Sequence, residues 1–307
     1  MNLIQPITPT TSIHVSIDRL SVCFHDPNLE NVTATCGMLL SDLKTKEIPG
    51  MTITKGALYG VNARIPLPYM TPADYTHPIY FQAAPHVPGR PSYRLDFNPS
   101  KMSQEGISDM LVLLDCIIDA DVMEFFHKGR VTRVDAAIDI SGYTVDDLIV
   151  VTSRKQKHGV YSDRYGVPET VYLGTPRSNR LVVYTKIDRE TGELKTRIEF
   201  RLKPGCPGYE VAGLPNPIRK LGLYKTSCLD GLVPGVPGRV IADSIRVRGV
   251  RHALEVFPPN VRKQIDKALL TSALLLPDPD TIWSLWPIAL VDAGLGKELG
   301  VNVGGLT

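Results

Sequence analysis

Hydrophobic and polar residues alternate along several segments, and three of these segments carry notable charged or tyrosine residues. In residues 130–140 and 195–203 the charged residues lie mostly an even number of positions apart. They include Arg133, Asp135 and Asp139 in the first segment, and Arg197, Glu199 and Arg201 in the second. Alternate side chains of a strand point to one face, so each segment predicts a strand with a charged face. Residues 181–190 predict a third strand, which carries Tyr184 and Lys186 on one side.

The remaining pattern predicts further strands and two helices before residue 204. Strands are expected over residues 12–24, within 51–64, at 93–99 and at 171–174, with a proline-rich irregular loop over 66–91. Apolar residues at helical spacing predict a helix over 106–128. Thr144, with Asp147 three residues later, predicts a short capped helix over 145–151.

The character of the chain changes after Lys203. Pro204-Gly-Cys-Pro-Gly208 is a candidate domain boundary, and segments with helical periodicity follow it. The expected fold is α+β, with an antiparallel sheet platform and helices over residues 1–204. A small helical C-terminal lobe is expected over residues 205–307.

Composition places the chain among globular proteins. Its 307 residues are 43% hydrophobic and 21% charged, which is ordinary for a protein with a large core. No run approaches about 18 uncharged apolar residues, and the first residues lack a secretory signal pattern, so no membrane association is expected. Five widely spaced cysteines without a CxxC pair argue against a disulfide scaffold or a structural zinc site. A reducing cytoplasm is the expected location.

Positive charge is concentrated in one segment. Residues 151–205 contain twelve Lys and Arg residues and six acidic ones, a net charge of +6, whereas the whole chain carries +2. Such segregation is typical of a protein that binds a polyanion, although a solvated surface would also explain it. The candidate phosphate contacts are Arg154, Lys155 and Lys157 in one loop, together with Arg177, Arg180 and Arg201.

Tyr184 is the candidate nucleophile. A free tyrosine has a pKa of about 10, so its oxygen attacks poorly at neutral pH unless the oxyanion is stabilised. Lys186 lies on the same strand face and can supply a positive charge there. The alternative is an ordinary structural tyrosine.

Asp135, Glu199 and Asp139 are the candidate metal ligands. Carboxylates gathered on one sheet face repel each other unless a cation lies among them, and oxygen ligands select Mg²⁺ or Mn²⁺. Such an ion could polarise a scissile phosphate. The alternative is that these acids pair with Arg133, Arg197 and Arg201 in a cross-strand ladder.

Taken in order, the segments resemble the replication initiation factor family of rolling-circle plasmids and phages, which includes nicking relaxases of integrative conjugative elements. The resemblance covers most of the chain. It rests on the 13–24 strand, Arg94-Leu-Asp-Phe-Asn-Pro99, Arg133-Val-Asp-Ala-Ala-Ile-Asp139, Val171-Tyr-Leu-Gly174, Arg177-Ser-Asn-Arg180, Val183-Tyr-Thr-Lys186 and Arg197-Ile-Glu-Phe-Arg-Leu202.

The resemblance implies a sheet platform like that of HUH endonucleases, with Tyr184 at the position of the family's nucleophile. It also implies that Tyr184 retains the 5′ phosphate and releases a 3′-OH primer. The chain has no His-hydrophobic-His pair. The family with this Tyr-x-Lys motif generally uses carboxylates around its metal instead.

The expected function is therefore rolling-circle initiation by nicking at an origin. A conjugative relaxase and a non-catalytic origin-binding protein are the alternatives. The expected partners are origin DNA, with a single-stranded or hairpin nick site, a host helicase and a host polymerase. A second strand transfer would need another subunit, as in a homodimer, or another tyrosine, for which Tyr172 and Tyr161 are candidates.

Overall fold

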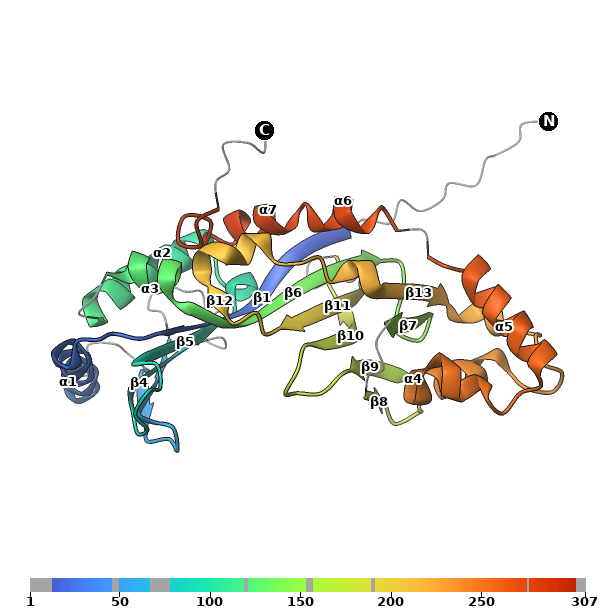
Figure 1. Cartoon of the computed structure of the whole chain (residues 1–307), viewed down its shortest axis with the longest axis horizontal. Coiled ribbons are helices and arrows are strands. Elements are labelled where there is room, and N and C mark those ends of the chain that lie inside the picture. Colours follow the sequence, from blue (N-terminus) through green and yellow to red (C-terminus); the bar gives the residue numbers. More distant parts are fainter. Residues whose placement is uncertain are drawn as a thin grey trace. The chain divides into compact units, whose positions relative to one another are not determined.

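The computed structural model describes residues 13–45, 50–66, 78–118, 121–152, 157–188, 191–274 and 276–301 (Figure 1). The strands are β1 (Ile13–Phe24), β2 (Thr52–Thr54), β3 (Tyr59–Ile65), β4 (Ile79–Pro85), β5 (Tyr93–Phe97), β6 (Arg130–Ser141), β7 (Leu148–Thr152), β8 (His158–Ser162), β9 (Pro168–Leu173), β10 (Arg180–Ile187), β11 (Leu194–Leu202), β12 (Cys206–Pro207) and β13 (Leu221–Lys225). The helices are α1 (Leu29–Thr45), α2 (Gln104–Ile117), α3 (Val122–Lys128), α4 (Gly238–Leu254), α5 (Pro259–Thr271), α6 (Pro279–Trp283) and α7 (Trp286–Asp292).

Antiparallel strands and helices together confirm the predicted α+β class. The chain divides into two compact units. Unit 1 consists mainly of residues 137–200 and 216–283, and unit 2 mainly of residues 16–136 and 201–215 with the segment from 284 onward. Strands β6 and β11 contribute residues to both units. The predicted division of the chain at residue 204 stays a prediction about independently folding domains.

Unit 2 is built on strands in the order β2-β3-β4-β5-β1-β6, with β12 also paired to β6. Its core is rich in aromatic contacts between strands and helix α3. Phe24 of β1 lies 5.6 Å from Phe125, and Phe97 of β5 lies 6.3 Å from Phe126, between ring centroids. Helix α2 begins at a Ser103 cap, whose side chain accepts a hydrogen bond from the backbone N–H of Gly106.

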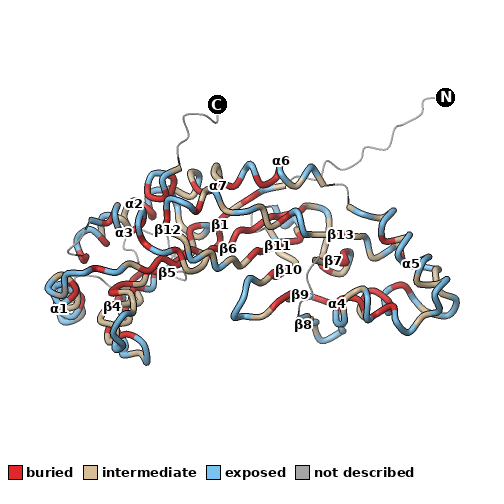
Figure 2. Tube along the Cα trace, in the orientation of Figure 1, coloured by how far each residue is buried: buried red, intermediate tan, exposed pale blue. Residues whose placement is uncertain are grey.

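Unit 1 contains strands in the order β6-β11-β10-β9-β8 and the separate β13-β7 pair. Figure 2 shows burial concentrated along β6 and β11. Helices α4 and α5 form a second core with β7, in which Ile149 packs with Ile245 and Ile265. Helix α5 buries Ile265 and Leu269 in this core.

The predicted helix over 145–151 is wrong. Thr144 and Asp147 do interact, because Asp147 accepts hydrogen bonds from both the backbone N–H and the hydroxyl of Thr144. The chain then continues as strand β7, which pairs with β13 about seventy residues later, Leu223 opposite Val150. The apolar, β-branched sequence of β7 suits a buried strand, and its partner lies far away in sequence.

Two other predictions need correction. The helix predicted over 106–128 is two helices, because Ile118 ends α2 in an extended conformation and Asp121 caps the start of α3. The predicted loop over 66–91 contains strand β4, which pairs with both β3 and β5; residues 67–77 lie outside the described part. Helix α1 has no counterpart among the predicted elements.

In the described part of the chain, none of the helices combines the length and the apolar character that crossing a bilayer requires.

Candidate functional site

Tyr184 lies in strand β10 of unit 1. The strand forms from the apolar, β-branched run that surrounds the tyrosine, and it pairs antiparallel with β9, Tyr184 opposite Thr170. Val183 is buried on one face, whereas Tyr184 and Lys186 are half-buried on the other. The structure therefore agrees with the sequence in placing Tyr184 and Lys186 on one face, about 7 Å apart along the strand.

Asp139 of β6 is the centre of the charged group on this face. Lys186 Nζ lies 3.5 Å from Asp139 Oδ2. Arg197 of β11 donates to the same carboxylate twice, from Nε to Oδ1 at 2.6 Å and from Nη2 to Oδ2 at 2.7 Å. Three strands thus bring one carboxylate and two cations together.

The carboxyl of Asp139 is ionised at neutral pH. Burial opposes ionisation, but the hydrogen bonds and charges of Arg197 and Lys186 outweigh burial and hold the pKa of Asp139 below its ordinary value. Arg197 is itself buried, 5% exposed, so the two groups form a buried ion pair. Asp139, Arg197 and Lys186 together carry one negative and two positive charges.

The surroundings of Asp139 do not fit a metal ligand in this arrangement. Both of its oxygens accept hydrogen bonds from one guanidinium, which would also repel a divalent cation. Glu199 is buried in β11, and strand alternation places it on the face of Arg197. No three His, Cys, Asp or Glu side chains lie close enough together to hold a metal ion among the residues that the structure describes.

Asp135 belongs to unit 2 and is also held by arginine. Arg133 Nε lies 2.8 Å from Oδ1 and Nη2 lies 2.6 Å from Oδ2 of this buried carboxylate. Arg201 Nε lies 3.9 Å from Oδ2. For Asp135 and Asp139, the arginine pairing that the sequence left open as an alternative is therefore present.

The predicted DNA contacts differ in their surroundings. Arg154 and Lys155 lie outside the described residues. Lys157 and Arg177 are exposed, the first before β8 and the second in the turn between β9 and β10. Arg180 is half-buried, with its guanidinium carbon 3.9 Å from the ring centroid of Tyr172. Arg201 is half-buried beside Asp135, so it serves a carboxylate.

One buried arginine, which was not among the predicted site residues, stabilises the segment that leads into strand β7 in unit 1. Arg246 of α4 is 2% exposed, and its Nη2 donates to the backbone carbonyls of Val145, Asp146 and Leu148. It fixes the turn before β7. The sequence around it does not predict this burial, because the backbone carbonyls that it contacts lie about 100 residues earlier.

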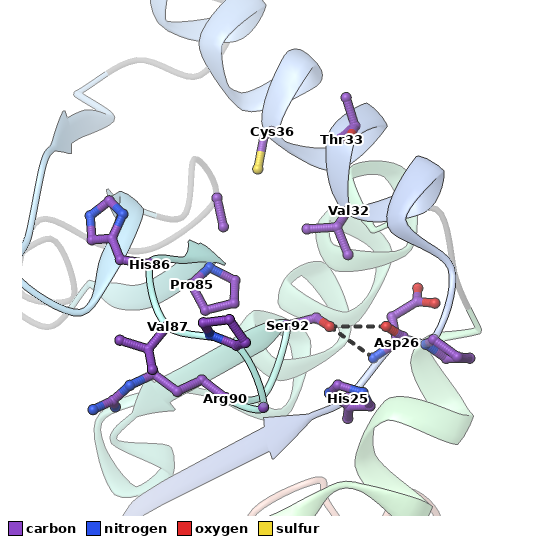
Figure 3. A pocket seen from close by; sticks show the side chains of 14 residues that line it. His25, Asp26, Val32, Thr33, Cys36, Pro85, His86, Val87, Arg90 and Ser92 are labelled. Atoms are coloured by element: carbon purple, nitrogen blue, oxygen red, sulfur yellow. Dashed lines mark hydrogen bonds between the residues drawn. The ribbon is translucent and has the colours of Figure 1, made fainter.

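A cavity of about 540 Å³ lies in unit 2 beside α1 (Figure 3). Its lining includes the polar residues His25, His86 and Arg90, and Cys36 of α1 also lines it. Ser92 accepts from the backbone N–H of Asp26 and donates to its carbonyl, which closes the floor of the cavity. None of the residues that the sequence marked as catalytic, metal-binding or DNA-binding lines this cavity.

Sequence comparisons point to one class of protein. No protein-family model matches the chain. Four curated proteins from Staphylococcus aureus, each named replication initiation protein, are similar to it. One is 31% identical over 129 residues, which cover 39% of this chain and 38% of the relative, and another is 33% identical over 98 residues, which cover 32% and 28%.

These matches span less than two fifths of the length of the relatives. All four carry the same name, and that name agrees with the resemblance seen in the order of the sequence segments. The matches support placing the chain in a replication initiator family.

Proposed function

We propose that this protein starts rolling-circle replication by nicking one strand of an origin with Tyr184 as the nucleophile. The observation that carries the proposal is the position of Lys186, beside Tyr184 on one strand face and held by Asp139. The antiparallel sheet would then serve as an HUH-endonuclease-like platform. The names of the relatives favour replication over conjugative transfer, which the same chemistry could also serve.

In the proposed reaction, the phenol of Tyr184 loses its proton and its oxygen attacks the scissile phosphorus. A new bond forms between the tyrosyl oxygen and phosphorus, the bond between phosphorus and the 3′ oxygen breaks, and the 3′ oxygen takes up a proton. The 5′ phosphate stays on the protein and the 3′-OH primes synthesis. The reverse attack by a 3′-OH rejoins the strand.

Lys186 would make this attack feasible near neutral pH. A cation close to a phenol favours the phenolate and lowers the cost of ionising a group whose ordinary pKa is about 10. Because Arg197 offsets Asp139, the positive charge of Lys186 remains available to the phenolate and to the phosphate. Asp139 acts as a positioning residue that fixes the ammonium group.

The predicted requirement for Mg²⁺ or Mn²⁺ remains a separate proposal. In the arrangement described, Asp135 and Asp139 are occupied by arginines, so no step of the reaction is assigned to a metal ion bound there. A host helicase and polymerase would follow the nick, and a homodimer could supply a second Tyr184 for termination.

Nicking of a supercoiled plasmid that carries the origin tests the proposal. Tyr184→Phe should abolish conversion to the open circle, and DNA binding should persist within a few-fold, because phosphate contacts dominate affinity. Tyr165→Phe removes the hydroxyl of an exposed tyrosine outside strand β10 and should nick normally. Full nicking by Tyr184→Phe would contradict the proposal and favour a different nucleophile. Retained binding without nicking by the unsubstituted protein would favour a non-catalytic origin-binding protein.

A further inference from the structure

The face of unit 1 that carries Tyr184 also carries two other tyrosines, and the strand registers define their positions. Tyr184 of β10 is opposite Thr170 of β9, and Thr170 is opposite Tyr161 of β8. Tyr172 lies in the adjacent row on the same face. Because neighbouring strands are about 4.8 Å apart, the backbone of Tyr161 lies about 10 Å from that of Tyr184.

A chain of side-chain contacts crosses three strands: Tyr161 of β8 contacts Tyr172 of β9, and Tyr172 contacts Arg180 of β10. The rings of Tyr161 and Tyr172 meet edge to face, with centroids 5.4 Å apart and an interplanar angle of 79°. The guanidinium of Arg180 covers the ring of Tyr172 at 3.9 Å. Both contacts are favourable geometries for their groups, so each side chain restricts the next.

This group is accessible and positively charged. Tyr161 is 65% exposed, and the neighbour of Tyr172 across the strand pair is Gly159, which has no side chain. On this face, the described positions of β8, β9 and β10 include no Asp or Glu; they are Gly159, Tyr161, Pro168, Thr170, Tyr172, Arg180, Val182, Tyr184 and Lys186. Arg180 Nε has no hydrogen-bond partner among the described residues.

Helix α4 packs against β8 without covering Tyr161, which is 65% exposed. It contacts β8 through His158, whose Nδ1 lies 3.1 Å from the carbonyl oxygen of Arg246. His158 is three residues from Tyr161, so strand alternation places the two side chains on opposite faces. The helix therefore packs behind the strand that carries Tyr161.

We propose that Tyr161, Tyr172 and Arg180, here called the stacking platform, bind the bases of single-stranded DNA next to the strand that Tyr184 cuts. The inference rests on the proposed function and adds the residues that hold the bases of the DNA. Exposed planar rings with a fixed guanidinium match nucleobases, which stack, joined to phosphates, which pair with cations. In a duplex the bases are already stacked on each other, so single-stranded DNA fits this surface better.

Binding to a labelled oligothymidylate, measured by fluorescence anisotropy in a Tyr184→Phe background, tests the platform without any nicking step. Tyr161→Ala should weaken binding by about 5- to 150-fold, the range measured for one base stacked on an aromatic ring. Tyr161→Phe keeps the ring and should bind within about twofold. Tyr165→Ala is a matched control, because Tyr165 is 74% exposed, carries Arg164 4.7 Å over its ring and lies in the turn between β8 and β9, outside the paired strands.

An oligomer of abasic nucleotides separates stacking from charge. It offers the same phosphates without bases, so Tyr161→Ala and the parent should bind it equally. Equal loss by Tyr161→Ala and Tyr165→Ala on oligothymidylate, or equal loss by Tyr161→Ala on both oligomers, would overturn the platform. Neither result depends on whether Tyr184 is the nucleophile, which the plasmid assay decides separately.

Discussion

Arg197 holds both carboxylate oxygens of Asp139, at 2.6 Å and 2.7 Å, while Lys186 contacts one of them at 3.5 Å. The carboxylate therefore serves two cations of different character. The buried guanidinium pairs with both of its oxygens, and the half-buried ammonium belongs to the strand that carries Tyr184. This arrangement separates a structural ion pair from a cation that can act on the phenol.

Replacing Asp139 with Asn should destabilise the protein. The substitution leaves the buried guanidinium of Arg197 without an opposite charge, and such a loss typically costs about 3 kcal/mol or more. Urea unfolding at pH 7 measures the free energy of unfolding. Asp280→Asn is the matched control, because Asp280 forms a similar two-bond pair with Arg219 on the surface of the same unit and should have little effect. Equal losses of unfolding free energy in Asp139→Asn and Asp280→Asn would contradict the assignment of Asp139 and Arg197 as a stabilising buried ion pair.

The ion pair between Asp139 and Arg197 makes the free energy of unfolding depend on pH. The pKa of Asp139 in the folded state lies below its ordinary value of about 3.9, so its stabilising contribution is complete at neutral pH. That contribution is lost as the pH falls below about 4 and through the folded-state pKa. The difference in unfolding free energy between the parent and Asp139→Asn should therefore narrow between pH 7 and pH 3. If the difference in unfolding free energy stayed constant from pH 7 to pH 3, the assignment of Asp139 as an ionised partner of Arg197 would be wrong.

Removing the charge of Lys186 should slow nicking and shift its pH dependence. Lys186→Met removes the cation that would favour the phenolate, so the rate at neutral pH should fall about tenfold and the rising limb of the pH profile should move to higher pH. Lys186→Arg should retain most of the rate. Lys195→Met removes an equal charge that Asp188 already pairs at 2.8 Å, and it should stay within about twofold of the parent. An unchanged pH profile for Lys186→Met would remove Lys186 from the mechanism.

The exposed cations near the proposed site should control the salt dependence of DNA binding. Arg177→Ala should lower the slope of log affinity against log salt by about 0.7 to 0.9, as expected for one phosphate contact. Specific and non-specific DNA should weaken alike, because phosphate contacts carry little sequence information. Lys263→Ala, at an exposed position of α5, should leave the slope unchanged. A larger change from Lys263→Ala would place the main contact on the helices of unit 1.

A metal requirement is tested by chelation. EDTA should stop nicking, and Mg²⁺ or Mn²⁺ should restore it. Because arginine occupies Asp139, Asp139→Asn should leave the half-saturating concentration of the ion unchanged, whereas Glu199→Gln should raise it if Glu199 is a ligand. Nicking that persists in EDTA would show that the ion pairs alone account for these carboxylates.

Strand alternation predicted the parts of the structure that depend on local pattern. It placed Tyr184 and Lys186 on one face and identified β6, β10 and β11, because the side-chain period of a strand is visible in a few residues. The sequence pattern did not predict strand β7, because its formation depends on pairing with β13 far along the chain. It also did not predict that α2 and α3 are separate helices, because that depends on the cap at Asp121.

The sequence alone could not decide whether the carboxylates bind a metal ion or pair with arginines. A face that carries Asp135, Asp139 and several arginines is compatible with a metal site or with ion pairs, because both need the same residue types at the same spacing. Only the geometry shows that Arg133 and Arg197 each hold a carboxylate through two nitrogens. The contact of Arg180 with Tyr172 likewise depends on the register of β9 with β10.

Detection of a covalent adduct between the protein and DNA is the most direct test of whether Tyr184 is the nucleophile. The protein is incubated with an oligonucleotide that contains the origin nick site, digested with protease and nuclease, and examined by mass spectrometry for a peptide that carries a nucleotide 5′ phosphate. A single modified peptide with the phosphate on Tyr184 is expected, and it should be absent from Tyr184→Phe. A phosphate on Tyr161 or Tyr172, or efficient nicking without any adduct, would contradict it.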